Sequence, residues 1–165
     1  MHLSEHFTLG EVTKTSVKTA DGRSATHGDA LLAKNIPSHV NIENLKNLCE
    51  NWLEELRENH NLIYEGVGDC KGDEPIIITS GYRSPEVNKA VGGSPTSNHL
   101  TGCAVDIRCV GIEQAIRYAA ILLDIADGTK RDFDELLIER NKQGRYWIHF
   151  AVRPKDNRRK MAFIL

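Results

Sequence analysis

The chain has 165 residues, of which 40% are hydrophobic and 27% charged, a size and composition typical of one globular domain with an ordinary core. The formal net charge of -2 gives no global electrostatic reason to expect nucleic acid or an anionic membrane as a partner. Binding specificity therefore has to come from a local site. No apolar run approaches the roughly 20 residues that a membrane-spanning helix needs.

The first residues, MHLSEH, lack a basic stretch followed by an apolar signal core, which predicts synthesis in the cytoplasm without a leader. The chain has four cysteines and none of them forms a CxxC pair, so we expect reduced thiols rather than disulfides. They are Cys49, Cys70, Cys103 and Cys109.

Residues 1–40 are predicted to be an N-terminal docking segment and loop, and residues 41–165 the core of the same single domain. Thr8 followed by Glu11 has the spacing of a helix N-cap, and residues 13–35 are polar with no sustained period, which predicts a loop with at most one helical turn.

Helical spacing of apolar residues predicts a core helix over residues 41–59, and the β-branched run of residues 75–79 predicts a short buried strand. Residues 85–91 are expected to form a helix, because Ser84 suits the N-cap and Pro85 the first helical position.

Residues 102–108 have the alternation of a strand, and residues 111–126 the spacing of a second amphipathic helix. Two apolar runs, residues 133–140 and 145–152, flank the turn-forming residues 141–144 and predict a hairpin. These elements favour an α+β fold in which helices flank an antiparallel sheet.

Three residues have the chemistry of a zinc site: His99 in a loop, Asp106 in a strand and His149 in an apolar strand. Each alone is explained by packing or surface exposure, but a histidine inside a strand needs a partner if it is buried. A catalytic zinc requires three protein ligands with the fourth position left to water, and two histidines with one aspartate meet that requirement. Gly102 between the first two ligands allows a loop ligand to fold back onto a strand.

The motifs around these residues resemble the M15 peptidases, the group of zinc DD-carboxypeptidases, D-Ala-D-Ala dipeptidases and phage endolysins. Residues 97–106, SNHLTGCAVD, look like the family's signature for its first two ligands, and residues 147–149, WIH, like its closing motif. Residues 80–84, SGYRS, and 88–93, NKAVGG, resemble the preceding segment, particularly in the short phage-type branch. The likeness runs from about Phe7 to about Arg158.

This resemblance implies the hedgehog/DD-peptidase fold, one Zn²⁺ held by His99, Asp106 and His149, and a peptidoglycan peptide as the substrate. It implies hydrolysis of a wall peptide bond, as a carboxypeptidase or an endopeptidase, by a protein expected to be monomeric. Action at the cell wall would then follow phage- or prophage-type release from the cytoplasm.

The family likeness also implies roles for residues around the metal. Arg83 would stabilise the oxyanion or hold a substrate carboxylate, a task suited to a fixed bidentate cation. Ser97 would bind substrate or orient His99, or simply cap its loop. Tyr82 and Trp147 are further substrate-binding candidates, Tyr82 as core or pocket wall.

The sequence differs from the better-known members of the family at the position of the general base. Many of those members carry an acid three residues before the last histidine. Tyr146 occupies that position here, and its phenol, with a pKa of about 10, cannot serve as an ordinary base near neutral pH. Glu139 and Asp134 on the facing strand are the nearest replacements. If Arg140 pairs with Tyr146, Glu139 shares a face of the sheet with His149. If Arg140 pairs with Arg145 instead, Glu139 points to the opposite face.

We favour Glu139 as the catalytic base. The alternative function, motivated by Tyr146, is a zinc-binding module on the same fold that has lost catalysis, as in the related hedgehog signalling domain. A metal-free scaffold protein is a third possibility, and it would make the ligand pattern a coincidence.

Overall fold

The computed structural model describes residues 1–15, 17 and 35–165. Most of the loop predicted over residues 13–35, including its expected helical turn, lies outside the described residues. At the N-terminus, Thr8 caps the short helix α1 (Leu9–Val12) and forms the predicted reciprocal capping box with Glu11. Phe7 is buried in the core.

The helix predicted over residues 41–59 is part of a longer rod. It comprises α2 (His39–Leu48), a π-helical turn η1 (Cys49–Leu53) and α3 (Glu54–Tyr64) in direct succession. Ser38 is its N-cap, so the helix begins at His39, two residues before the start that the apolar pattern predicts. The apolar pattern underestimates the rod because its first turn is exposed, while beyond residue 59 the buried residues are the polar His60 and Asn61 and the apolar Leu62 and Ile63 are exposed.

The two other main helices follow their predictions closely. In α4 (Pro85–Ala90) the hydroxyl of Ser84 accepts the hydrogen bond of the Val87 amide, and proline occupies the first turn as expected. The second amphipathic helix, α5 (Gly111–Thr129), extends three residues beyond the predicted end. Among the described residues, no helix is both long and apolar enough to cross a membrane.

The sheet has five strands in the order β1-β2-β4-β3-β5. They are β1 (Ile78–Ser80), β2 (Ala104–Cys109), β3 (Glu135–Arg140), β4 (Tyr146–Ala151) and β5 (Lys160–Ile164). The fold class is α+β, as predicted, and all pairs are antiparallel except β3 with β5, which is parallel. The edge strand β5 and its parallel pairing were not predicted. The strand predicted over residues 75–79 is shorter and lies later, as β1 covers Ile78–Ser80.

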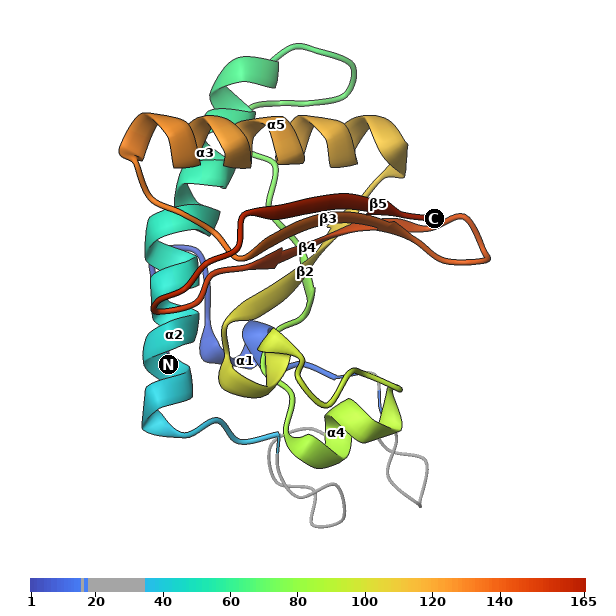
Figure 1. Ribbon diagram of the computed structural model, residues 1–165. Coiled ribbons are helices and arrows are strands. Elements are labelled where there is room, and N and C mark those ends of the chain that lie inside the picture. The colour runs from blue at the N-terminus through green and yellow to red at the C-terminus, as the bar shows by residue number, and fades with distance from the viewer. Residues whose placement is uncertain (16, 18–34) are drawn as a thin grey trace.

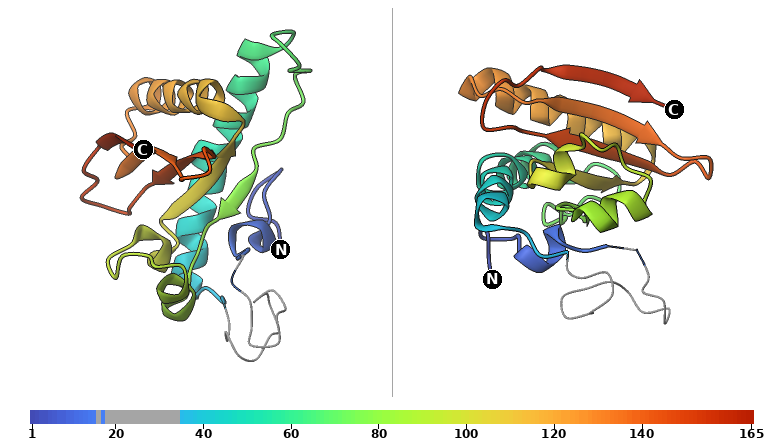
Figure 2. Two further views of the ribbon diagram at one scale, coloured as in Figure 1. Left: turned by 90° about the vertical axis from the view of Figure 1, so that its right-hand side faces the viewer. Right: turned by 60° about the horizontal axis from the view of Figure 1, so that its bottom comes forward.

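The layers of the fold place the two faces of the sheet in different surroundings. Figure 1 shows α5 lying across one face, with the rod of α2, η1 and α3 running past one end of the strands, and Figure 2 shows the same layers from two other sides. The core lies between these elements, and the strands contribute every second residue to it. Those residues are Ile78, Val105, Ile107, Cys109, Leu136, Ile138, Ile148 and Phe150.

Alternation along the strands therefore turns the intervening residues to the other face, toward α4 and the short helix η2 (Asn98–Thr101). Asp106, His149 and Leu137 form one row across this face, because the first two are paired between β2 and β4 and the last two between β4 and β3. The candidate ligands thus lie on the side of the sheet that α5 does not cover.

Candidate metal centre

The sheet and the η2 helix bring the three predicted ligands together. Asp106 and His149 are direct cross-strand partners, and His99 comes from η2 just before β2 begins. Gly102 makes the reversal between them with a positive φ of 70°, and a Cβ at this position would lie 2.5 Å from the carbonyl oxygen of Asn41. Only glycine fits this turn without strain, so the spacing of the first two ligands depends on it.

The donor atoms have the geometry of a tetrahedral site. Asp106 Oδ1 lies 3.3 Å from His99 Nε2 and 3.0 Å from His149 Nδ1. Zinc bonds of about 2.0–2.1 Å at the tetrahedral angle put neighbouring donors about 3.3 Å apart. The three residues are at most 9% exposed, and one donor atom from each lies within 4.8 Å of the others. His99, Asp106 and His149 therefore fit a zinc ion with one position left open.

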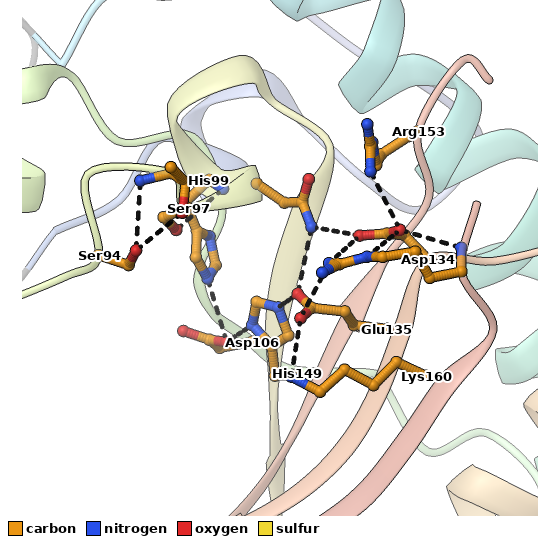
Figure 3. A network of polar contacts seen from close by, with 12 residues as sticks. Ser94, Ser97, His99, Asp106, Asp134, Glu135, His149, Arg153 and Lys160 are labelled. Carbon is orange, nitrogen blue, oxygen red and sulfur yellow. Dashed lines mark hydrogen bonds and ion pairs between the residues drawn. The ribbon is translucent and has the colours of Figure 1, made fainter. Parts of the chain in front are cut away.

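Each of the two histidines has an outer partner that fixes its orientation, and Figure 3 shows the partner of His149. The carbonyl oxygen of Gly81 lies 2.6 Å from His99 Nδ1, so this nitrogen donates and Nε2 is left free for a metal. His149 Nε2 lies 3.2 Å from Glu135 Oε2, which leaves Nδ1 free in the same way. Metal-binding histidines characteristically make this second hydrogen bond.

The ionisation of the site reflects its burial and its charges. Burial alone would raise the pKa of Asp106, but the interactions with His99 and His149 hold it well below its usual range. Burial would likewise lower the pKa of His149, yet the hydrogen bonds to Asp106 and Glu135 outweigh it and raise this pKa to about 9. Without a metal, a proton on His149 balances the carboxylate; a divalent cation would take its place.

Arg83 is held beside the ligands. Its Nη2 donates to Asp106 Oδ2 at 2.7 Å and its Nε to Ser80 Oγ at 2.9 Å, while its backbone amide donates to the carbonyl oxygen of His99 at 3.0 Å. A cleft of about 310 Å³ opens in front of these groups, and Trp147 forms part of its wall. The guanidinium is thus fixed at the edge of the candidate site, on the wall of this cleft.

Glu139 lies on the ligand face of the sheet. The hairpin pairs Arg140 with Tyr146 and Glu139 with Trp147, which is the register that directs this carboxylate to the side of His149. Burial raises the pKa of Glu139, although the nearby His149 opposes the shift. A carboxylate with a raised pKa is better suited to accept a proton near neutral pH.

Tyr146 and Asp134 are placed away from that role. Tyr146 is three residues from His149, so strand alternation turns it to the opposite face, where it packs against the core. The Asp134 side chain is fully buried and its carboxylate oxygens accept hydrogen bonds from Arg158 and Asn98. The Asp134 carboxylate is therefore already engaged in structural hydrogen bonds. Of the two acids considered for the base, only Glu139 faces the ligands.

The other predicted site residues have more ordinary surroundings. The Ser97 hydroxyl caps η2 by accepting the hydrogen bond of the His99 amide at 3.3 Å, so it orients the segment that carries a ligand. Tyr82 packs in the hydrophobic core, one of the two placements expected for it, and is not among the residues that line the cleft. Cys103 is buried and lies outside the metal-binding group.

Sequence reasoning missed Glu135 and Asn98, which contact each other beside His149. A signal for Glu135 was present, since the register that directs Glu139 to the ligand face also directs Glu135 there. Asn98 immediately precedes the first ligand, but nothing in its neighbours indicates a contact with β3.

One comparison with known proteins agrees with the site. Residues 5–130 match the family model described as Peptidase M15, and this match includes His99 and Asp106 but ends before β3. No curated protein matches the chain. His149 lies beyond the matched residues, and the pairing of β2 with β4 brings it beside Asp106. Because the family model covers most of the sequence, the chain belongs to the Peptidase M15 family.

Proposed function

We propose that the protein is a zinc-dependent peptidase that hydrolyses a peptide bond in the stem or cross-link peptides of bacterial peptidoglycan. Membership of the M15 family indicates a metallopeptidase. The observation that carries the proposal is the convergence of His99 Nε2, Asp106 Oδ1 and His149 Nδ1 beside an open cleft. Two neutral imidazoles and a carboxylate are the donors of catalytic zinc in peptidases.

The metal and the protein would divide the work of hydrolysis. When bound, zinc would polarise the scissile carbonyl and lower the pKa of the attacking water. Glu139, on the face of His149, would take the proton of that water and pass it to the leaving amine. Its raised pKa supports this assignment, because it brings the carboxylate closer to the pH at which the proton must move.

Arg83 and Trp147 would position the substrate. The Arg83 guanidinium is fixed by Ser80 and Asp106, so it presents its charge to the cleft without first losing conformational freedom. A wall peptide carries carboxylate groups, and a planar guanidinium binds either such a group or the developing oxyanion. Trp147 provides an apolar wall on the same cleft.

The test is release of amines from purified peptidoglycan. The wild-type protein should release them, chelator should abolish the release, and added zinc should restore it. His149→Ala should be inactive under all three conditions, whereas His39→Ala, at an exposed position in the first turn of α2, should behave as wild type. Full activity of His149→Ala would exclude the proposed mechanism.

The alternative is a zinc-binding module without catalysis. It predicts one bound zinc per chain and no amine release from any wall preparation, so metal content and activity measured on the same sample separate the two functions. The position of Glu139 on the ligand face favours the enzyme, because the loss of the usual acid at Tyr146 was the reason to doubt catalysis.

A further inference from the structure

Glu135 contacts the side of His149 that faces away from the other ligands. Its Oε2 lies 3.2 Å from His149 Nε2, while Nδ1 of the same ring lies 3.0 Å from Asp106 Oδ1. The imidazole is therefore held at both nitrogens, one by a carboxylate outside the candidate metal site and one by a ligand within it (Figure 3).

The two oxygens of Glu135 have separate partners. Oε1 faces the outer cations, 3.2 Å from Arg158 Nη2 and 3.6 Å from Lys160 Nζ. Oε2 faces inward, toward His149 and the amide of Asn98. The ion pairs with the C-terminal segment thus hold the carboxylate in place without competing for the oxygen that meets the histidine.

Asn98 joins this carboxylate to the segment that carries the first ligand. Its Nδ2 donates to Glu135 Oε2 at 3.1 Å and to Asp134 Oδ2 at 2.8 Å, and His99 is the next residue along η2. A single amide therefore links η2 to β3, in addition to the direct contact between His99 and Asp106.

Asp134 anchors the network. Its side chain is 0% exposed and accepts two hydrogen bonds from the Arg158 guanidinium, at 2.9 and 2.7 Å, and one from the Arg158 backbone amide at 3.1 Å. Its own backbone is bonded to β4 and to the start of β5. The series Arg158, Asp134, Asn98, Glu135 and His149 is consequently continuous from the C-terminal segment to the ligand.

We infer that Glu135 is the positioning residue of His149: it accepts the Nε2 proton, fixes the tautomer that presents Nδ1 to the metal, and is itself held by Asn98 and Arg158. The inference rests on the proposed zinc site and adds a determinant of its affinity. Carboxylate partners of this kind orient metal-binding histidines, and their loss typically weakens metal binding by roughly 10–100-fold.

The experiment compares zinc affinity, by competition with a chromophoric chelator, in wild type, Glu135→Ala and Glu135→Gln. Glu135→Ala should bind zinc about 10–100-fold more weakly and alter the visible spectrum of the Co²⁺-substituted protein. Glu135→Gln retains an acceptor oxygen and should recover most of the affinity. Glu113→Ala, which removes an exposed carboxylate on α5, should match wild type. Wild-type affinity and an unchanged Co²⁺ spectrum in Glu135→Ala would overturn the inference.

A second measurement needs no substitution. Long-range ¹H–¹⁵N spectra of the zinc-loaded wild-type protein should show His149 protonated at Nε2 and metal-bound at Nδ1; coordination through Nε2 would overturn the inference even if Glu135→Ala failed to fold. If wild type binds zinc as described but releases no amines from peptidoglycan, the positioning role stands and the proposed peptidase activity fails. If wild type binds no zinc, both fail.

Discussion

Glu139 on β3 is the direct cross-strand partner of Trp147 on β4, two residues before His149 on the same face of the hairpin. A shift of this register by one residue would turn Glu139 into the core and remove the carboxylate from the ligand face. The catalytic assignment therefore depends on the turn at residues 141–145, where the Asn141 amide donates to the carbonyl oxygen of Arg145 at 3.1 Å.

Replacing Glu139 with glutamine should separate catalysis from metal binding. The substitution keeps the shape of the side chain but removes its ability to accept a proton, so kcat on wall peptide should fall by roughly 10²–10⁴-fold. Zinc affinity should stay close to that of wild type, because Glu139 is not one of the three convergent donors. Amine release and chelator competition on the same preparation measure both quantities.

Glu113→Gln is the matched control for this change, since Glu113 is an exposed glutamate on the helix that covers the opposite face of the sheet. It should leave both activity and zinc affinity unchanged. Retention of wild-type kcat by Glu139→Gln would assign the base to another group.

Arg83→Lys tests whether a fixed planar cation is needed. Lysine keeps the charge but cannot bond Ser80 and Asp106 together as the guanidinium does. We expect kcat/KM to fall by roughly 10²–10³-fold, as for the loss of one oxyanion donor. If Arg83 binds a substrate carboxylate, the change should appear mainly in KM; if it stabilises the oxyanion, mainly in kcat. Arg57→Lys on α3 is the control, and equal activity of both variants would refute the role.

The sequence predicted the parts of the fold that carry a local signal. The cap at Ser84 and the hairpin follow from residue types and spacing, and they hold in the structure. The three expected ligands come together as a group that could hold a metal ion. The edge strand β5 was missed because its residues are mostly exposed, so they show no alternation between buried and exposed positions. Its residues pair with residues of β3 that lie 25 positions earlier in the chain, and no local pattern indicates such a contact.

The outer partners of the site were missed for a related reason. Asn98 and Arg158 meet at Asp134 although the three residues are far apart in the sequence, and charged or amide residues at strand ends are usually solvated. Tyr82 was expected as core or pocket wall, and the structure places it among the core side chains. Both cases depend on tertiary packing, which composition and period do not report.

Asp134→Asn should destabilise the metal-free protein. It removes the charge that two hydrogen bonds from the Arg158 guanidinium satisfy in a fully buried position. A loss of roughly 2–4 kcal/mol in the free energy of unfolding is expected for a broken buried ion pair whose other member reaches solvent. Urea unfolding with chelator present at pH 7 measures it, with the exposed Asp127→Asn as control.

The same pair of proteins should show a defined pH dependence. Burial alone would raise the pKa of Asp134, but the hydrogen bonds from Arg158 and Asn98 hold it well below its usual range. A depressed pKa gives stability that is fully present above the unfolded value of about 3.9 and is lost as the pH falls below it. The difference between wild type and Asp134→Asn should therefore be constant from pH 7 to 5 and shrink by about 1 kcal/mol at pH 3. A difference that grows in acid would contradict the ion pair.

The four thiols should differ sharply in reactivity. Burial raises the pKa of Cys49 and of Cys109 to about 12, and burial also raises the pKa of Cys103, so these groups stay protonated and shielded at neutral pH. Cys70 is the one cysteine that is only partly buried, and all four are free. Ellman's reagent should label one thiol per chain quickly and four after unfolding, and Cys70→Ser should remove the fast phase. Zinc should leave that phase unchanged, because the convergent donors are nitrogen and oxygen atoms; slower labelling of Cys70 in the presence of zinc would contradict this donor set.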